Sequence, residues 1–427
     1  MAILPAGALS MELSAYQERF GFQAPVIDQP PHTDLGMVVV IPCFNETQLV
    51  PTLQSLADCE LPDTAVEVLV VINSGEQHPE AIRKQNEATL QAARAWSAQQ
   101  TSAIAFHWIV ADRLPRKHAG VGLARRIGLD EAAARLYAVQ RPESVLLCYD
   151  ADCLCAPNYL KVVYEHFLAR PKQLAASIHF EHPLEGEAYA ASVYEAIAHY
   201  ELFLRYYRWG LHWAGHPFAY HTIGSSMAVR AHSYLKQGGM NRRKAGEDFY
   251  FLQKLIPLGN FGEITTTKVI PAPRASDRVP FGTGRAVGQW LDGSRPRWEG
   301  YHPQSFHDLK QLLDQVEQLY DAPAAKAIVN QLSPLLQQFL ATRSWEQHLA
   351  EIRNHSGSQA GFVQRFFRWF NAFEALKWVH YARDNGYPDQ ELTGVAREWL
   401  GTMGQAQPND VLALLAIYRQ LDINQGN

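Results

Sequence analysis

Two aspartates, Asp150 and Asp152, follow the short apolar run Val145–Tyr149. An apolar run of this length that ends in turn-type residues predicts a buried strand of a parallel sheet. Ligands of open α/β sheets bind just beyond the carboxyl ends of such strands. Carboxylate oxygens suit Mg²⁺ or Mn²⁺, and Mg²⁺ usually takes its remaining ligands from water and substrate phosphates. The pattern indicates a metal site for a diphosphate, although an isolated Asp-X-Asp is more often only an acidic turn.

The elements that must position these aspartates alternate between strand and helix. The expected strands are 37–41, 66–72, 103–110 and 145–149, and the helices between them are 48–56, 79–99 and 122–139. Apolar strands that alternate with helices predict an α/β fold, a doubly wound and mostly parallel sheet with helices on both faces. Right-handed crossovers place the loops that follow the strands at one edge. We therefore expect one crevice to contain Asn45, Glu46, Asn73, Ser74, Asp112, Asp150 and Asp152.

The second half of the chain has a different pattern. A helix over 157–168, a strand over 174–180, an aromatic helix over 188–210 and a helix over 249–258 are expected first. Strand signals then end near residue 301, and helical patterns follow at 305–320, 323–342, 360–384, 389–400 and 409–421. The expected organisation is an irregular extension over 1–35, the α/β domain over 36–300 and an all-helical C-terminal domain over 301–427.

Composition excludes several classes of function. The net charge is −5 and the two signs are mixed along the chain, so no nucleic acid partner is expected. The five cysteines are an odd number and suit reduced thiols in a cytoplasmic protein better than a disulfide framework. We find no signal-peptide pattern and no apolar run of about 18 residues, so no transmembrane segment is expected. Contact with a membrane surface remains open.

Further residue groups could do chemistry. Glu247 and Asp248 begin an expected helix, where acidic residues complement the helix dipole or could supply a general base. Arg116, Lys117 and His118 follow the third strand and could meet an anionic ligand or form an exposed basic loop. The histidines at 199, 212, 216 and 221 have no metal-binding spacing and favour the lining of an aromatic pocket over a zinc site. The glycine pairs fit neither a dinucleotide fingerprint nor a P-loop.

Taken in order, the motifs resemble those of the inverting GT-A glycosyltransferases of family 2. The run from Val38 to Glu46 resembles the family's opening strand with its Pro-x-x-Asn-Glu turn, and Leu123–Ala132 resembles its Ala-x-Asn-x-Gly helix. Asp150-Ala-Asp152 matches the Asp-x-Asp metal motif. The later series of Gly-Ser-x-Met, Gly-Gly and Glu-Asp has its counterparts in Gly224–Met227, Gly238-Gly239 and Glu247-Asp248. The resemblance covers about residues 37–260.

The resemblance implies a role for each matched residue. Asp248 would be the catalytic base with Glu247 beside it, and Asp150 and Asp152 would hold Mn²⁺ or Mg²⁺. The donor nucleotide would lie against Pro42, Asn45, Glu46 and Asp150, and from their positions we also expect it to meet Asn73, Lys117 and Arg126. Gly224, Ser225 and Ser226 would border the donor sugar and the acceptor. The implied donor is a nucleoside-diphosphate sugar, and the acceptor could be a saccharide, a lipid-linked molecule or a small molecule.

The sequence also departs from the family pattern. Asn73-Ser74-Gly75 stands where the family usually has Asp-Asp-Gly-Ser, and Arg126 stands in place of the helix asparagine. Beyond the Glu-Asp helix we expect Arg274, Arg278 or Arg285 to neutralise the leaving diphosphate, because arginine binds phosphate bidentately. This expectation comes from the residue types and not from a matched motif.

Two other functions remain possible for this sequence. The departures at Asn73 and Arg126 keep open a catalytically inactive binding or scaffold protein on the same fold. A sugar nucleotidyltransferase also combines a parallel sheet with paired carboxylates, but it normally has a glycine-rich basic loop after the first strand. Pro42–Glu46 lacks such a loop, so transfer of a sugar with inversion at the anomeric carbon is the favoured function.

Overall fold

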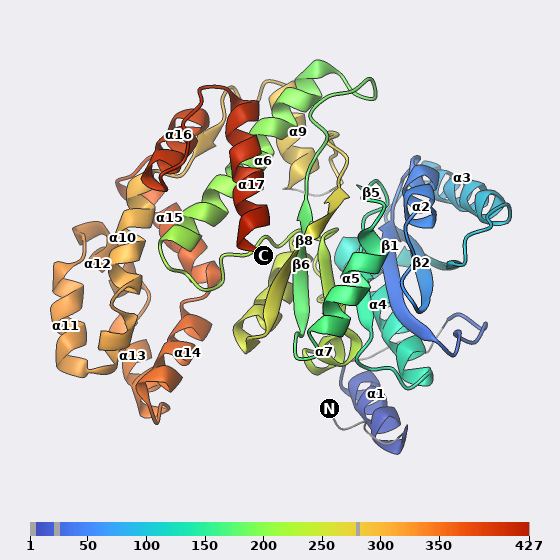
Figure 1. Cartoon of the computed structure of the whole chain (residues 1–427), viewed down its shortest axis with the longest axis horizontal. Coiled ribbons are helices and arrows are strands. Elements are labelled where there is room, and N and C mark those ends of the chain that lie inside the picture. The colour runs from blue at the N-terminus through green and yellow to red at the C-terminus, as the bar shows by residue number, and fades with distance from the viewer. Residues whose placement is uncertain (1–5, 21–25, 279–281, 427) are drawn as a thin grey trace. The chain divides into compact units, whose positions relative to one another are not determined.

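The computed structural model describes residues 6–20, 26–278 and 282–426, with main chain alone described for 6–10. The chain divides into two compact units, each shown in Figure 1. The first comprises Met1–Gly186, Thr222–Arg285 and Asp422–Asn427, and the second comprises Glu187–His221 and Ala286–Leu421.

The first unit is built on a sheet in the order β3-β2-β1-β4-β7-β6-β8-β5. Its strands are β1 (Leu35–Cys43), β2 (Ala65–Gly75), β3 (Ala105–Leu114), β4 (Val145–Cys148), β5 (Leu154–Cys155), β6 (Ala175–Phe180), β7 (Met227–Arg230) and β8 (Phe261–Ile270). The strands β3, β2, β1 and β4 are parallel neighbours, while β7 runs antiparallel to β4 and β6. The expected strands therefore align their carboxyl ends at one edge, as predicted.

Helices cover both faces of this sheet. They are α1 (Ala6–Phe20), α2 (Leu49–Ala57), α3 (Glu80–Ser97), α4 (Val121–Ala138), α5 (Tyr159–Ala169), α7 (Ala231–Lys236) and α8 (Glu247–Leu255), followed by the 3₁₀ turn η1 (Ile256–Leu258). Val71 of β2 lies against Gly128 of α4. A Cβ added to Gly128 would lie 2.9 Å from Cγ2 of Val71. The next residue, Ile72, shares a cavity with Leu90 of α3. Because successive strand residues point to opposite faces, α3 and α4 lie on opposite sides. The predicted doubly wound sheet is confirmed.

The second unit is mainly helical. It contains α6 (Ala191–Trp213), α10 (Pro303–Leu313), η2 (Val316–Tyr320), α11 (Ala322–Gln331), α12 (Pro334–Thr342), α13 (Trp345–Asn354), α14 (Gln359–Trp369), α15 (Ala372–Asn385) and α16 (Leu392–Thr402). Two helices cross the division between the units, α9 (Thr283–Leu291) and α17 (Val411–Gln425). The core of the second unit contains Trp378, whose indole N–H donates to the carbonyl of Ser305 at 2.8 Å. The expected helical C-terminal region is present, with one short ladder between β9 (Glu299–Gly300) and β10 (Gln390–Glu391).

Several element boundaries differ from the expected ones. The expected helix over 323–342 is two helices, because Ser333 caps a new one and Pro334 begins it. Strand β8 and helix α9 were not expected from the sequence. The buried and half-exposed residues of β8 do not alternate, so the strand has no period of two for a sequence pattern to detect.

The aromatic helix α6 belongs to the second unit, although the expected α/β domain extended to residue 300. The hydroxyl of Tyr206 on this helix donates to the carbonyl of Tyr301 at 2.5 Å, and its ring contacts Trp399. The helix therefore packs with the C-terminal helices of its own unit.

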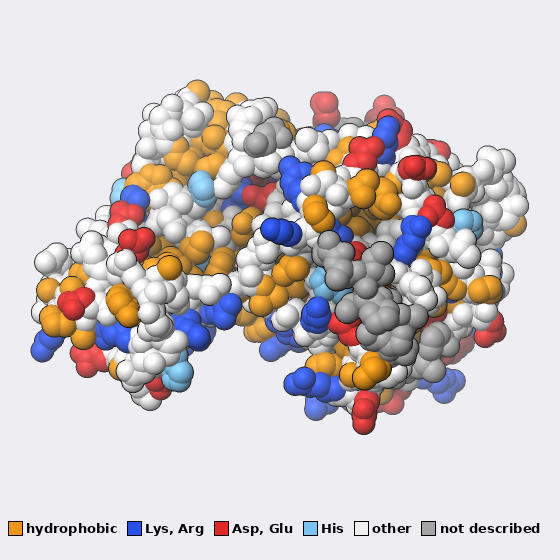
Figure 2. Space-filling model, turned by 60° about the horizontal axis from the view of Figure 1, so that its bottom comes forward, with side chains coloured by type: hydrophobic (Ala, Val, Ile, Leu, Met, Phe, Trp, Pro, Cys, Tyr) orange, Lys and Arg blue, Asp and Glu red, His pale blue; other side chains and the backbone are white. Residues whose placement is uncertain are grey.

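The surface carries charges of both signs. On the face shown in Figure 2, Lys and Arg side chains are interspersed with Asp and Glu side chains and with small apolar areas. In the part of the chain that the structure describes, every helix is too short or too polar to cross a bilayer.

Candidate active site

Arg125 of α4 joins two acidic segments in a buried ion-pair cluster. Its Nη2 group donates to Asp150, which follows β4, and its Nη1 group donates to Glu247 at the start of α8. The side chains of Arg125 and Glu247 are each only 3% exposed, whereas that of Asp150 is 38% exposed. Burial alone would lower the pKa of Arg125, but the carboxylates of Asp150 and Glu247 raise it. The guanidinium is therefore permanently charged and fixes the positions of both acids.

The segment before β7 needs small residues to leave room for this cluster. A Cβ on Gly224 would lie within 2.4 Å of Nη1 of Arg125 and 2.8 Å of its Cζ. Ser225 and Ser226 follow and are both buried, with exposures of 2% and 1%. The backbone of Ser226 is tied to β6, because its carbonyl accepts the N–H of Ile178 at 2.8 Å. The structure thus brings the predicted Gly-Ser-Ser segment against the ion-pair cluster.

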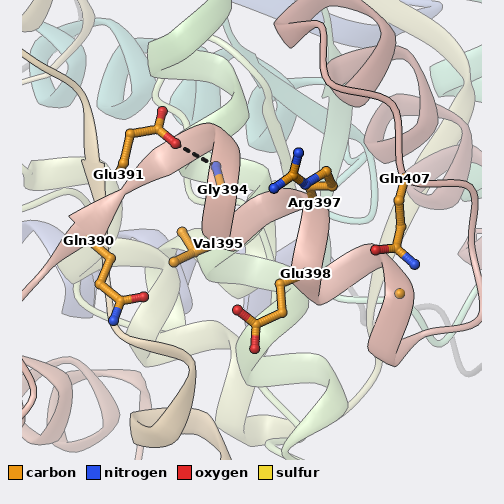
Figure 3. Close-up of a pocket in the computed structure, with 8 residues that line it drawn as sticks. Gln390, Glu391, Gly394, Val395, Arg397, Glu398 and Gln407 are labelled. Carbon is orange, nitrogen blue, oxygen red and sulfur yellow. Dashed lines mark hydrogen bonds between the residues drawn. The ribbon is translucent and has the colours of Figure 1, made fainter.

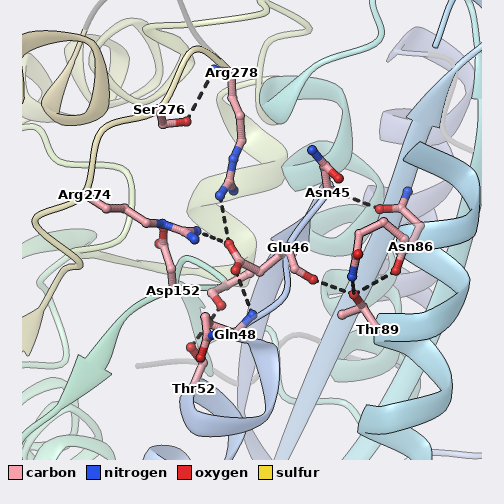
Figure 4. A network of polar contacts seen from close by, with 12 residues as sticks. Asn45, Glu46, Gln48, Thr52, Asn86, Thr89, Asp152, Arg274, Ser276 and Arg278 are labelled. Carbon is pink, nitrogen blue, oxygen red and sulfur yellow. Dashed lines mark hydrogen bonds and ion pairs between the residues drawn. The ribbon is translucent and has the colours of Figure 1, made fainter. Parts of the chain in front are cut away.

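A second cluster surrounds Glu46, which follows β1 (Figure 4). Its carboxylate is 0% exposed and accepts hydrogen bonds from the side chains of Arg274 and Arg278. Arg274 also donates to Oδ2 of Asp152, from Nε at 3.1 Å and from Nη2 at 2.7 Å. The structure therefore brings both predicted arginines against Glu46, and one of them, Arg274, against the second aspartate of the Asp-Ala-Asp motif.

Asn45 and Asn73 lie in a network next to this cluster. Asn45 adopts a positive φ of 47°, and its backbone N–H donates to Oδ1 of Asn86 at 2.9 Å. The side-chain amide of Asn86 in turn donates to the carbonyl of Asn73 at 2.9 Å. The Oδ1 atom of Asn73 is buried and has no hydrogen-bond partner among the described residues. Asn73 thus keeps a polar atom available, although it stands where the family usually has an aspartate.

Each of the two aspartates uses only one of its carboxylate oxygens in hydrogen bonds within the described residues. Hydrogen bonds from Arg125 and Arg274 reach Oδ1 of Asp150 and Oδ2 of Asp152. The other oxygen of each carboxylate accepts no hydrogen bond from the residues that the structure describes. No group of three or more His, Cys, Asp or Glu residues in that part of the chain could hold a metal. Two carboxylate oxygens fit Mg²⁺ or Mn²⁺ if diphosphate and water supply the remaining ligands.

Asp248 differs from Glu247 in the exposure of its side chain. Its side chain is half-buried, and its Oδ1 accepts the N–H of Phe249 at 2.7 Å. Burial raises the pKa of Asp248 above its ordinary value, although the charge of Arg125 opposes the shift. Burial also raises the pKa of Glu247, to about 7, but Glu247 is buried and paired with Arg125, so Asp248 is the more accessible of the two acids.

Three predicted residues make no hydrogen bond or ion pair to either cluster within the described part of the chain. Arg126 points away from the cluster, because its guanidinium donates to the carbonyls of Met240 and Phe20 and pairs with Asp130 at 3.4 Å. The prediction that Arg126 binds the nucleotide is not supported by this placement, since the side chain is engaged in holding α1. Lys117 is exposed in the loop before α4, and Arg285 pairs with Asp277 at 3.3 Å.

Pro42 is buried near the end of β1 and is paired in register with Val71. It closes the strand from which Asn45 and Glu46 extend. The sequence favoured an aromatic surrounding over a zinc site for the histidines between 199 and 221. One of them, His216, is buried against the rings of Phe218 and Phe367.

Arg125 is the residue that sequence reasoning missed. It stands next to Arg126, and the pattern of the helix alone does not say which arginine faces the site. A usable signal was the spacing of Gly122, Arg125 and Gly128. Residues three apart share a helix face, and a Cβ on Gly122 would lie 3.0 Å from the Cβ of Glu247. Gly122 therefore marks the part of this face that packs on the acidic segment, while Gly128 packs on Val40 and Val71 of the sheet.

A further hollow of about 740 Å³ lies on the second unit around α16 (Figure 3). Its acidic and basic side chains are largely engaged in local structure. Glu391 caps α16 by accepting the N–H groups of Thr393 and Gly394, and Arg397 donates to Asn409. The hollow therefore offers no constellation of reactive groups comparable to the cluster around Arg125.

Comparisons with known proteins agree with this geometry. Residues 38–222 match the model of the family described as "Glycosyl transferase family 2". These residues, a little under half of the chain, are similar to a family 2 glycosyltransferase domain. The match includes β1, α4 and the Asp-Ala-Asp segment, and the chain is a glycosyltransferase.

Similar solved structures share little sequence with the chain. One is S. aureus TarS 1–349 in complex with UDP-GlcNAc, at 16% identity and a TM-score of 0.40, covering 91% of this chain and 89% of that one. Another is the mannosyltransferase PcManGT from Pyrobaculum calidifontis in complex with GDP-Man and Mn²⁺, at 16% identity and a TM-score of 0.34, covering 85% and 97%. No curated protein matches the chain. At these TM-scores neither likeness carries weight for mechanism.

Proposed function

We propose that this glycosyltransferase is metal-dependent and inverts the configuration of the anomeric carbon. The observation that supports the proposal is the joining of Asp150 and Glu247 through one buried guanidinium. This bridge holds the acidic pair that follows β4 and the acid at the start of α8 in one crevice. Such an arrangement supports a reaction in which a diphosphate and a general base would lie on either side of a bound sugar.

The donor's diphosphate would be held at the Asp-Ala-Asp segment. When bound there, Mg²⁺ or Mn²⁺ would act as a Lewis acid for the leaving diphosphate. Asp150 and Asp152 would hold it through the two carboxylate oxygens that arginine leaves free. The guanidinium groups of Arg274 and Arg278 would stabilise the negative charge that develops on the diphosphate. Asn73 is the candidate contact to the nucleoside, because its buried Oδ1 lacks a partner among the described residues.

Asp248 would accept the proton of the acceptor hydroxyl. The acceptor oxygen attacks the anomeric carbon from the face opposite the diphosphate, so the new glycosidic bond forms as the carbon–oxygen bond to the diphosphate breaks. This single displacement inverts the configuration. Burial raises the pKa of Asp248, which makes its carboxylate a better proton acceptor than an exposed aspartate. Glu247 stays paired with Arg125 and orients the start of α8.

The compartment and the acceptor belong to the proposal as well. The five cysteines are all free and buried, which favours the reducing cytoplasm. The acceptor carries a hydroxyl, and its class is left to an acceptor screen.

The test is calorimetric titration of the protein with UDP, GDP, ADP and CMP, with and without Mn²⁺. One nucleotide that binds only with metal would support the proposal and identify the donor class. Turnover of the matching nucleotide sugar would then be measured, and the anomeric configuration of the product would be read by NMR. Retention of configuration would contradict the single displacement. Absence of binding to all four nucleotides and of any sugar-nucleotide hydrolysis would favour an inactive scaffold.

A further inference from the structure

Glu46 uses both of its carboxylate oxygens within the protein. Oε1 accepts the backbone N–H of Gln48 at 2.8 Å. Oε2 accepts a hydrogen bond from Nη2 of Arg278 at 2.9 Å and another from Nη2 of Arg274. The carboxylate is 0% exposed, whereas the side chains of Arg274 and Arg278 are 24% and 30% exposed. A ligand in the crevice can therefore reach the arginines but not the carboxylate that holds them.

The two arginines keep hydrogen-bond donors for a ligand. Among the residues that the structure describes, Nη1 of Arg274 and both Nε and Nη1 of Arg278 donate to no protein group. Figure 4 shows the two side chains converging on Glu46 from the segment that follows β8. Counted with Asp152, which also pairs with Arg274, the two guanidiniums balance two carboxylates, so what remains for a ligand is the unused N–H groups of arginine, which match phosphate oxygens.

The position of Arg274 identifies which part of the donor these groups would meet. It donates to Asp152 at 2.7 Å, and Asp152 is a proposed holder of the metal at the diphosphate. We propose that Glu46 is a positioning residue, which holds Arg274 and Arg278 in place to stabilise the leaving diphosphate. This inference rests on the proposed function and changes the role that the family resemblance implies for Glu46, which was a contact to the nucleotide base or ribose.

The charge state of Glu46 is consistent with this role. Burial would raise the pKa of Glu46, but the hydrogen bonds from Arg274 and the Gln48 amide hold the pKa below its ordinary value. The carboxylate thus stays ionised, and it keeps the two guanidiniums, which would otherwise repel each other, close together.

The test compares Glu46→Gln with the wild-type protein during turnover of UDP-GlcNAc or GDP-mannose, whichever the wild type uses. Glutamine has nearly the same shape but removes the charge. Because donors aimed at the developing charge act mainly in the transition state, kcat should fall by roughly 10²-fold while the affinity for the free nucleoside stays unchanged. Glu60→Gln, which changes an exposed glutamate that pairs with Lys161 at 3.2 Å, is the matched control.

A second set of variants separates positioning from mere structural support. Arg278→Ala alters a partly exposed side chain and should lower kcat in the same way without a folding defect. In the background of the Arg274→Ala/Arg278→Ala double variant, Glu46→Gln should have no additional effect on kcat, because there is nothing left for it to position. Glu46→Asp should restore part of the rate.

The possible outcomes distinguish the two proposals. Wild-type protein that neither binds a nucleotide nor turns over a nucleotide sugar would overturn the proposed function, and this inference with it. Wild-type turnover combined with a loss of nucleoside affinity in Glu46→Gln, or with effects that add to those of the arginine variants, would overturn the inference alone. In that case Glu46 would contact the nucleoside directly.

Discussion

Arg125 and Glu247 form a buried ion pair that joins α4 to the first residue of α8. Their side chains are equally inaccessible, each 3% exposed, and the same guanidinium extends to Asp150 beyond β4. The pair therefore connects the segment proposed to hold the diphosphate with the segment that carries the proposed base.

We expect Arg125→Met to destabilise the protein, because it leaves the carboxylate of Glu247 buried without a partner. Removing one member of a buried pair costs about 3–5 kcal/mol. The double variant Arg125→Met/Glu247→Gln should recover part of this loss, since no buried charge remains uncompensated. Urea unfolding measures the difference. Lys161→Met, in an exposed pair, should change the free energy of unfolding by less than about 1 kcal/mol. If Arg125→Met and Lys161→Met lowered the free energy of unfolding equally, the buried pair would not be a special source of stability.

Gly224→Ala should reduce activity more than it reduces stability. The added methyl would overlap the guanidinium of Arg125, which two carboxylates hold and which cannot easily move aside. Displacing Arg125 would misplace Asp150, so metal-dependent nucleotide binding should weaken roughly tenfold or more. Gly357→Ala is the control, since nothing lies within 4 Å of the position that its Cβ would take. Nucleotide titration of both variants provides the comparison.

Much of the fold was predictable because the core strands are apolar over their whole length. β1 and β4 are buried on both faces and appear in the sequence as continuous apolar runs. Strand β8 alternates poorly and was missed. The placement of α6 in the second unit could not be predicted, because sequence order does not say which core an aromatic helix joins.

The part of the site that lies at the ends of strands was predictable from the sequence. Asp150 and Asp152 follow β4, and the parallel topology brings Glu46 to the same edge. The roles of Glu46 and Arg125 depend on partners more than 100 residues away, at Arg274 and Glu247, with sequence separations of 228 and 122. No local pattern carries that information, so Arg126 was chosen in place of its neighbour.

The second unit should lose stability as the pH falls. His216 is buried and neutral, with Nδ1 accepting the N–H of Phe218 at 3.2 Å and Nε2 within 3.1 Å of the carbonyl of Phe370. Burial lowers its pKa from 6.5 to about 4. The stabilising contribution is therefore complete above pH 6.5 and is lost progressively towards about pH 4, because in this range the unfolded chain binds a proton that the folded protein excludes.

The loss at His216 amounts to about 3 kcal/mol at most, from a little over two pKa units. Chemical denaturation across this pH range should show a shallower slope for His216→Gln than for the wild type. His355→Gln, at an exposed histidine, should keep the wild-type slope. An unchanged slope in His216→Gln would assign the acid sensitivity to other groups.

Asp152→Asn should make nucleotide binding insensitive to metal. Asparagine can still accept a hydrogen bond from Arg274, so the arginine cluster around Glu46 should remain in place. It lacks the charge that a divalent cation requires. Titration of the variant with Mn²⁺ and the cognate nucleoside diphosphate should show the weak affinity of the metal-free wild type, with or without the ion. Full Mn²⁺ dependence in this variant would rule out Asp152 as a metal ligand.

Asp248→Asn should abolish transfer while leaving the binding of donor and metal intact. The amide cannot accept the acceptor's proton, and loss of general-base catalysis lowers rates by about 10²–10⁴-fold. Because burial raises the pKa of Asp248, wild-type kcat/KM should fall on the acidic side at a pH above the ordinary value of about 3.9 for aspartate. Glu247→Gln retains the proposed base, so its pH profile should keep an acidic limb even if its rate falls. Normal turnover of Asp248→Asn would remove Asp248 from the mechanism, and an acidic limb lost only in Glu247→Gln would make Glu247 the base.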